Sequence, residues 1–244
     1  MKINVLTACE CSGRVRDAFR AVGCNAYSCD LKPDECASTF HFKADCFAVL
    51  ERFKWDLVIA FPPCTHLCVS GAMYFDAKRK DGRQAEGVDF FMRLASLPSK
   101  HPDLRVAIEN PVGIMSSLYR QPDQIIHPWQ FGETESKTTC LWLHGLPALK
   151  STRVMRPASF YCPACRKVYA DLERRGCPAC GAFGQARWAN QSPSGADRRS
   201  PSEHRATDRA RTYPGIAAAM AAQWGRRESW PPLVEMGLFD KLED

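Results

Sequence analysis

The first half of the chain alternates short apolar segments, typical of buried strands, with segments whose apolar residues have helical spacing. The predicted strands cover residues 3–8, 25–29, 56–60 and 106–108, and the predicted helices cover 13–22, 46–53 and 83–95. This alternation predicts a doubly wound parallel sheet, an α/β fold with helices packed on both faces. A later strand is expected within 138–149, and a further helix over 215–224.

In such sheets, binding and catalytic groups gather where the strands end at their carboxyl termini. The four predicted strands are followed by residues 9–12, Asp30, residues 62–64 and residues 109–110. We therefore expect a functional site to be built from these four places.

The composition limits the class of protein. The chain has 244 residues, of which 45% are hydrophobic, and this suits one α/β domain with a modest insertion. No apolar run approaches the roughly 20 residues that cross a bilayer, and the first residues do not form a signal peptide. Thirteen cysteines, an odd number, without an export signal indicate that most are reduced thiols, metal ligands or catalytic groups. We expect a cytoplasmic monomer that does not bind a membrane.

Two of the strand ends carry reactive side chains. In the segment FPPCTHLCVSG, two prolines fix the backbone just before Cys64, and a partly ionised cysteine is the strongest side-chain nucleophile. Glu109, in the segment AIENPVG, ends the next predicted strand. A cysteine and an acid on neighbouring strand ends can act as a nucleophile and a proton-handling partner.

These two motifs, in this order and at this separation, resemble the cytosine carbon-5 DNA methyltransferase family. The resemblance covers most of residues 3–150 and 196–226 and implies a Rossmann-like class I S-adenosylmethionine-dependent methyltransferase fold. It implies that Cys64 adds to ring carbon 6 of cytosine and that Glu109 holds ring nitrogen 3 and the exocyclic amine. Lys137 lies where the family has arginines that support the flipped base, and it completes the expected catalytic set. The implied partner is double-stranded DNA, with the target base flipped out of the helix.

The resemblance also places S-adenosylmethionine on the strand ends. The segment ACECSGRVRDAF stands where the family has a glycine-rich loop, and only Gly13 matches a family glycine. Asp30 matches the acid that binds the ribose hydroxyls, and Asp45 matches the one that contacts the adenine amine. The expected donor-binding residues are Glu10, Cys11, Ser12, Gly13, Asp30, Leu31, Asp45, Phe61 and Pro62.

A second constellation is independent of that family. Two Cys-Pro-Ala-Cys units contribute Cys162, Cys165, Cys177 and Cys180, with eleven residues between the units. Paired units of this spacing are typical of a zinc ribbon, in which four thiolates close a tetrahedral structural site. We therefore expect zinc with a structural role.

The zinc ribbon defines the expected domain organisation. Residues 1–150 and 196–230 are assigned to the catalytic domain, 151–195 to the insertion, and 231–244 to a tail. The insertion occupies the position of the family's target-recognition region, and within it arginines flank the cysteine units of the ribbon, at Arg166, Arg174, Arg175 and Arg187. We therefore expect it to be a small four-cysteine zinc-ribbon module that recognises DNA. The small size favours a phage or mobile-element enzyme that protects against restriction.

Two other functions are compatible with the sequence. The same cysteine chemistry can act on RNA or on a free pyrimidine nucleotide. Alternatively, the chain is a non-catalytic nucleic-acid-binding protein whose zinc ribbon is the functional part. The segment that follows Ser70 is expected to be a basic loop that either closes over DNA or is simply solvated.

Overall fold

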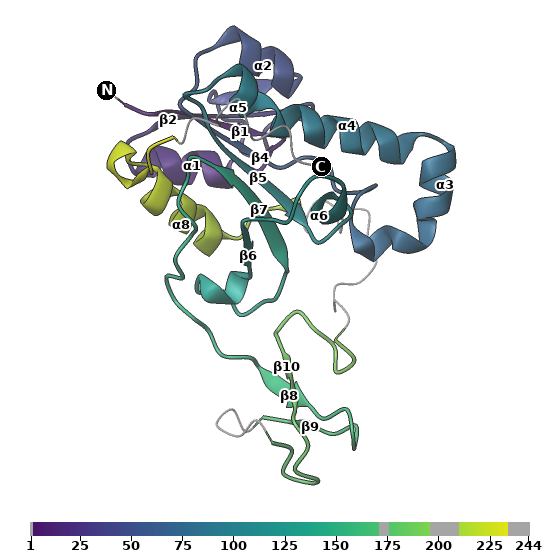
Figure 1. The fold of residues 1–244 in the computed structure, drawn as a ribbon. Helices are drawn as coiled ribbons and strands as arrows, with labels where there is room; N and C mark the ends of the chain where they lie inside the picture. Colours follow the sequence, from purple (N-terminus) through teal and green to yellow (C-terminus); the bar gives the residue numbers. More distant parts are fainter. Residues whose placement is uncertain (1, 171–175, 196–209, 234–244) are drawn as a thin grey trace.

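A computed structural model describes residues 2–170, 176–195 and 210–233. It has a seven-stranded sheet with helices on both faces and, apart from it, a small three-stranded sheet (Figure 1). The large sheet consists of β1 (Asn4–Ala8), β2 (Asn25–Asp30), β3 (His41–Lys43), β4 (Leu57–Ala60), β5 (Arg105–Pro111), β6 (Gln124–Ile126) and β7 (Thr139–His144). The small sheet consists of β8 (Ser159–Tyr161), β9 (Val168–Tyr169) and β10 (Gln185–Arg187).

The strand order of the large sheet is β3-β2-β1-β4-β5-β7-β6. The pairs from β3 to β5 are parallel, whereas β7 is antiparallel to both β5 and β6. The order reverses beside β1, the switch point at which Rossmann-like sheets bind ligands. The predicted Rossmann-like α/β fold is thus confirmed, but a purely parallel sheet is wrong at β7.

Helices cover both faces of the sheet (Figure 1). One face carries α1 (Arg14–Ala21) and α8 (Pro214–Trp224), and the other carries helices from the middle of the chain. The latter are α2 (Cys46–Arg52), α4 (Arg83–Ala95), α5 (Leu97–Lys100) and α6 (Met115–Leu118). Alternate residues of β4 enter the two cores, with Leu57 and Ile59 on the α1 side and Val58 and Ala60 on the α4 side. Burial on both faces explains why this strand is continuously apolar.

The expectation of a basic loop after Ser70 is wrong. The structure instead forms η1 (Val69–Tyr74), a 3-10 segment, and the helix α3 (Phe75–Lys80), which leads directly to α4. The side chain of Lys78 is buried, so the segment is only partly a solvated basic face. Other short 3-10 turns are η2 (Pro128–Gln130) and η3 (Arg227–Ser229). Among the described residues, none of the helices has the length and apolar character that crossing a membrane requires.

Helix α8 fixes the C-terminal part of the body that is built around the seven-stranded sheet. Trp224 is completely buried in the core with Phe19, and its indole Nε1 donates to the carbonyl of Pro147 at 2.9 Å. Gly215 is needed because a Cβ there would lie 1.9 Å from the carbonyl oxygen of Phe131. This close approach holds the start of α8 against the segment that leads to β7.

We expect Trp224→Ala to lower the free energy of unfolding by about 3–5 kcal/mol, since it removes a buried ring and leaves a cavity. Met92→Ala, at a partly exposed position of α4, is the control and should cost less than about 1 kcal/mol. Urea unfolding monitored by circular dichroism measures both changes. Equal costs for the two variants would contradict the packing described for α8.

Candidate functional site

The segment after β4 holds Cys64 in a fixed turn. The carbonyl of Cys64 accepts hydrogen bonds from the amides of Leu67 and Cys68, both at 3.0 Å, so the chain makes one helical turn there. Pro62 and Pro63 restrict the backbone before the cysteine. The side chain of Cys64 is half-buried, so the thiol is partly shielded from water but can still be reached from outside.

The loops after β4 and β5 are joined to each other. The buried side chain of Asn110 donates to the carbonyl of Pro62 at 3.0 Å. Two backbone hydrogen bonds follow, from Val69 to Val112 at 3.1 Å and from Ile114 to Leu67 at 3.0 Å. A Cβ at Gly113 would lie 2.3 Å from the carbonyl oxygen of Leu67, so this approach requires glycine.

Glu109 and Lys137 form an ion pair beside this junction. The Lys137 Nζ lies 3.7 Å from the Glu109 Oε1, and both side chains are mostly buried. Glu109 comes from β5, and Lys137 precedes β7, the antiparallel neighbour of that strand. Lys137 is therefore brought to the acid by the β-strand pairing that the parallel-sheet expectation had missed.

These groups set the reactivity of Cys64. Burial raises the pKa of the Cys64 thiol above its usual range, and the neighbouring Cys68 and the Glu109 carboxylate raise it further. The Lys137 ammonium opposes this and lowers the pKa. Cys64, Glu109 and Lys137, the three expected catalytic residues, therefore interact electrostatically at the ends of β4, β5 and the segment before β7.

The loop after β1 is organised around a buried carboxylate. Glu10 accepts hydrogen bonds from the hydroxyl of Thr7 at 3.2 Å, from the hydroxyl of Ser12, and from the amide of Arg14 at 3.1 Å. Burial raises the pKa of Glu10 even though these hydrogen bonds act in the opposite direction. Glu10 and Ser12, two of the expected donor-binding residues, thus serve the shape of the loop.

Gly13 is the turn between this loop and α1. It has a φ of 71°, which favours glycine, and a Cβ there would lie 2.2 Å from the Arg16 guanidinium. Arg16 is buried and pairs with Asp17 at 2.7 Å and with Asp34. Burial opposes its charge, but these two carboxylates raise its pKa overall. The loop after β2 is consequently attached to the loop after β1.

The remaining expected donor-binding residues surround the same strand ends. Asp30 Oδ1 accepts from the Lys32 amide at 2.8 Å, and Asp45 caps α2 by accepting from the amides of Phe47 and Ala48 at 3.0 and 3.1 Å. The sulfurs of Cys9 and Cys46 are 3.9 Å apart, so the loop before α1 and the start of α2 are adjacent. Leu31 is largely exposed, Cys11 and Phe61 are half-buried, and Pro62 is buried.

The four expected zinc ligands lie together in the turns beside the small sheet. Their sulfur atoms are all within 4.8 Å of one another, and the Cys162–Cys180 and Cys165–Cys177 pairs are each 3.5 Å apart. Tetrahedral zinc with bonds of about 2.3 Å to sulfur needs sulfurs about 3.8 Å apart, so the set fits. This cluster could hold a zinc ion.

The two Cys-Pro-Ala-Cys turns have the same backbone structure. The amide of Cys162 donates to Lys167 and that of Cys177 donates to Ala182, both at 2.8 Å. The residue after each second cysteine is left-handed, with a φ of 60° at Arg166 and 74° at Gly181. Backbone amides of Cys165 and Ala164 lower the pKa of Cys162 to about 7, which favours the thiolate that a metal needs.

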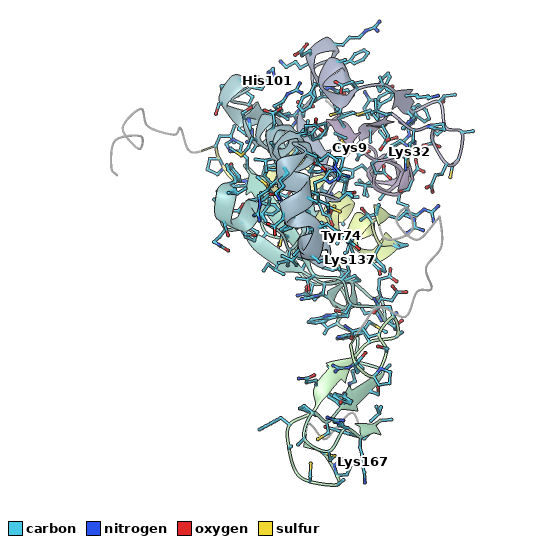
Figure 2. All side chains as sticks on the ribbon, turned by 90° about the vertical axis from the view of Figure 1, so that its right-hand side faces the viewer. Cys9, Lys32, Tyr74, His101, Lys137 and Lys167 are labelled. Carbon is cyan, nitrogen blue, oxygen red and sulfur yellow. The ribbon has the colours of Figure 1, made fainter. Side chains whose placement is uncertain are left out.

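Aromatic stacking joins the ribbon to the body that is built around the seven-stranded sheet. The rings of Trp129 and Trp188 are 5.2 Å apart and nearly parallel, and the ring of His127 also stacks on Trp129, at 5.4 Å. Ser136 and Asn190 exchange two hydrogen bonds of 2.9 Å beside this stack. Figure 2 shows that the ribbon, with Lys167 near its tip, projects from the side of the body that carries Tyr74 and Lys137.

The basic flanks of the ribbon are only partly as expected. Arg187 is buried, lies over the ring of Tyr161 and donates to the carbonyl of Pro193 at 2.8 Å, so its guanidinium is used within the ribbon. Arg166 is exposed, whereas Arg174 and Arg175 lie outside the described residues. Most of segment 196–211 and of the tail also lies outside them, so the expected roles there stay predictions.

Sequence reasoning missed Lys78 and the Cys9–Cys46 pair. Lys78 was grouped with exposed cations, but its Nζ donates to the Thr65 carbonyl at 2.6 Å. The aromatic residues before it, Tyr74 and Phe75, were the available signal of a packed segment. A hydrogen bond to Cys46 and burial raise the pKa of Cys9, and nothing in the sequence spacing indicated this pairing.

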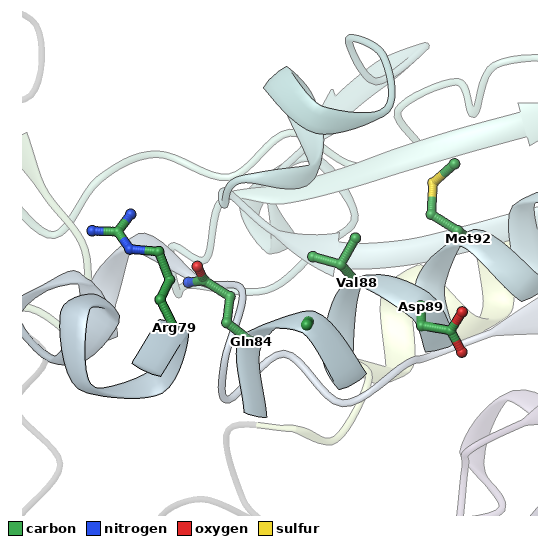
Figure 3. A pocket seen from close by; sticks show the side chains of 6 residues that line it. Arg79, Gln84, Val88, Asp89 and Met92 are labelled. Atoms are coloured by element: carbon green, nitrogen blue, oxygen red, sulfur yellow. The ribbon is translucent and has the colours of Figure 1, made fainter. Parts of the chain in front are cut away.

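A shallow hollow lies on α3 and α4, away from these groups (Figure 3). Its lining includes Arg79, Val88, Asp89 and Met92, and none of the expected catalytic or donor-binding residues. The hollow therefore does not define the candidate site.

No family model and no curated protein matches the chain. Among solved structures, it is similar to a candidate DNA modification methyltransferase encoded within a prophage of E. coli. The identity is 14% and the TM-score 0.42, over 58% of this chain and 46% of that chain. The chain thus spans less than half the length of that protein, and the functional inference depends on the site itself.

The charges around Cys64 predict opposite effects for two substitutions. Lys137→Met should shift the pH dependence of Cys64 alkylation by iodoacetamide to higher pH, because the cation that lowers the thiol pKa is lost. Glu109→Gln should shift it to lower pH, because the carboxylate that raises the pKa is lost. Peptide mass spectrometry of Cys64 gives the rates. Shifts in the same direction would contradict this electrostatic arrangement.

The cysteine cluster predicts about one zinc ion per chain. Cys177→Ser should abolish this stoichiometry, and a chelator should increase amide hydrogen exchange in the three strands of the ribbon but not in β1 or β4. The control is Cys36→Ser, an exposed cysteine outside the cluster, which should retain the metal. Elemental analysis and hydrogen-exchange mass spectrometry provide the two measurements. Full zinc occupancy in Cys177→Ser would refute this ligand set.

Proposed function

We propose that the chain is an S-adenosylmethionine-dependent DNA methyltransferase that modifies carbon 5 of cytosine. The observation that carries the proposal is the convergence of Cys64, Glu109 and Lys137. A half-buried thiol and an ion-paired acid arise from neighbouring strand ends of a Rossmann-like sheet. The antiparallel β7 between β5 and β6 fits the class I methyltransferase fold that the sequence resembles.

The proposed chemistry begins with the thiolate of Cys64, which forms a bond to ring carbon 6. Glu109 holds ring nitrogen 3 and the exocyclic amine, and it stabilises the charge that develops as the thiolate adds. Lys137 keeps Glu109 oriented and favours the thiolate of Cys64. Carbon 5, made electron-rich by this addition, would then take the methyl group from the sulfonium sulfur of the donor, which would leave as S-adenosylhomocysteine. The carbon-5 proton is then lost to a base, and the bond between the Cys64 sulfur and carbon 6 breaks to release the methylated base.

S-adenosylmethionine supplies the electrophilic methyl group. The residues proposed to hold it are those around the ends of β1, β2 and β4, which share one edge because both β2 and β4 pair in parallel with β1. The adjacent sulfurs of Cys9 and Cys46 bring the start of α2 to the same edge. Asp30 and Asp45 lie at the end of β2 and the start of α2, as ribose and adenine contacts would require. Glu10 is proposed to contribute indirectly, because its hydrogen bonds fix the loop after β1 that would contact the donor.

The ribbon is the proposed DNA-recognition module. It projects from the side of the body that carries Lys137 (Figure 2), so a duplex bound there would lie across the candidate site. Its interior uses Phe160 and Tyr169 for packing, at 5.7 Å between the rings, whereas Phe183 is exposed. Residues 151–195 are accordingly proposed as an insertion in the catalytic domain of a cytoplasmic monomer, with zinc in a structural role.

The decisive test is covalent trapping with DNA that contains 5-fluorocytosine, in the presence of S-adenosylmethionine. Fluorine at carbon 5 blocks the final elimination, so the unsubstituted protein should give a denaturation-resistant adduct. Cys64→Ala should give none, and Cys36→Ala, which removes an exposed cysteine, should react like the parent. Gel electrophoresis and peptide mass spectrometry identify the adduct and the linked residue.

The other outcomes distinguish the alternatives. An adduct with 5-fluorocytosine RNA or a free nucleotide, but not with DNA, would replace the substrate and retain the chemistry. No adduct with any substrate, together with no binding of S-adenosylmethionine by calorimetry, would leave a non-catalytic nucleic-acid-binding protein.

A further inference from the structure

Lys78 is a buried cation placed directly behind the Cys64 turn. It lies in the middle of α3, between Ala77 and Arg79, and only 7% of it is exposed. The neighbouring side chain of Arg79 is 61% exposed and pairs with Asp76 on the surface. Lys78 is therefore turned inward from a helix whose other cations face solvent.

The partner of the Lys78 ammonium is the backbone beside Cys64. Its Nζ donates to the carbonyl oxygen of Thr65 at 2.6 Å. The rings of Tyr74 and Phe75 lie 6.0 and 5.8 Å from the same atom. Among the described residues, the ion pairs of the structure do not include Lys78, so the carbonyl is the polar group that compensates its burial.

The chain leaves space for this hydrogen bond at Gly71. A Cβ at that position would lie 3.1 Å from the Lys78 Nζ and 3.7 Å from the Thr65 carbonyl oxygen. Gly71 has a φ of −110°, which any residue adopts, so glycine provides room here and not backbone freedom; a Cβ would press on the Lys78 ammonium. η1 and α3 are thus packed onto the turn through one small residue and one lysine.

We propose that Lys78 is a positioning residue that fixes the peptide between Thr65 and His66, within the Cys64 turn, and thereby aims the sulfur at its target. The proposal rests on the proposed function. Pro62 and Pro63 restrict the backbone before the cysteine, whereas the bond from Lys78 restrains it on the other side. A buried lysine that served packing alone would not need a donor, because methionine fills the same space without the cost of burying a charge.

The test compares Lys78→Met with Lys100→Met, an exposed lysine on α5 at the far end of the body. Both variants lose one positive charge, but only the first loses the contact with Thr65. We expect Lys78→Met to keep its DNA affinity and to form the 5-fluorocytosine adduct about tenfold more slowly or worse, because the nucleophile is no longer aligned. Lys78→Arg should restore part of the rate, since a guanidinium can donate to the same carbonyl.

Gly71→Ala provides a second variant that keeps the lysine and crowds the hydrogen bond. It should slow adduct formation in the same way without a loss of charge. Single-turnover rates at saturating DNA, with DNA affinity measured separately, give the readouts for all four variants, and circular dichroism verifies folding. A purely structural role would lower thermal stability or DNA affinity without this selective loss of rate.

The outcomes separate the two proposals. If the unsubstituted protein forms no adduct, the proposed function fails. If the unsubstituted protein forms the adduct and both Lys78→Met and Gly71→Ala react at its rate, the positioning role of Lys78 is refuted. Equal losses in Lys78→Met and Lys100→Met would also refute it, because charge alone would then explain the effect.

Discussion

The junction between the loops that follow β4 and β5 is the constraint on which the candidate site depends. Parallel pairing aligns Ala60 with Ile108, and the side chain of Asn110 then donates to the Pro62 carbonyl. Further along, Gly113 allows the two loops to touch and exchange backbone hydrogen bonds. Cys64 and Glu109 are therefore placed by a continuous set of backbone contacts that extends from the sheet. Because a buried amide without a partner is costly, this junction is held more firmly than a surface loop would be.

Beside this fixed backbone, a carboxylate and an ammonium act in opposite directions on the pKa of Cys64. Burial favours a neutral Cys64, and the neighbouring Glu109 carboxylate acts in the same direction. Lys137 opposes both effects in part, because it lies 3.7 Å from Glu109 and also stabilises a thiolate at Cys64. A thiol that is kept mostly protonated until a substrate arrives is protected from side reactions, whereas a nearby cation keeps ionisation accessible. The antiparallel β7 makes this possible, since it delivers the segment before Thr139 to the acid-bearing end of β5.

The sequence predicted the parts of the structure in which local pattern and burial agree. β4 was predicted because its residues are continuously apolar, as in a buried strand. α4 was predicted because its apolar residues recur with helical spacing. The cysteine cluster was predicted because metal ligation constrains spacing directly. β3 and β6 are three residues long and have no period to detect. The inward orientation of Lys78 and the direction of β7 depend on tertiary contacts, which charge patterns and hydropathy along the chain do not contain.

The loop after β1, which we propose binds the methyl donor, is ordered mainly by side-chain hydrogen bonds. Glycines are favoured in such loops because they permit left-handed turns and close approach. This chain keeps one at Gly13 and holds the rest with the side chain of Glu10, on which a hydroxyl from each side and the amide of Arg14 converge. Arg16 then ties the start of α1 to Asp34 in the neighbouring loop. In this loop, side-chain hydrogen bonds hold the backbone in place, whereas glycine-rich loops depend on the conformations that glycine can adopt. A scan for glycine spacing fails on such a loop, although its position at the switch point of the sheet is unchanged.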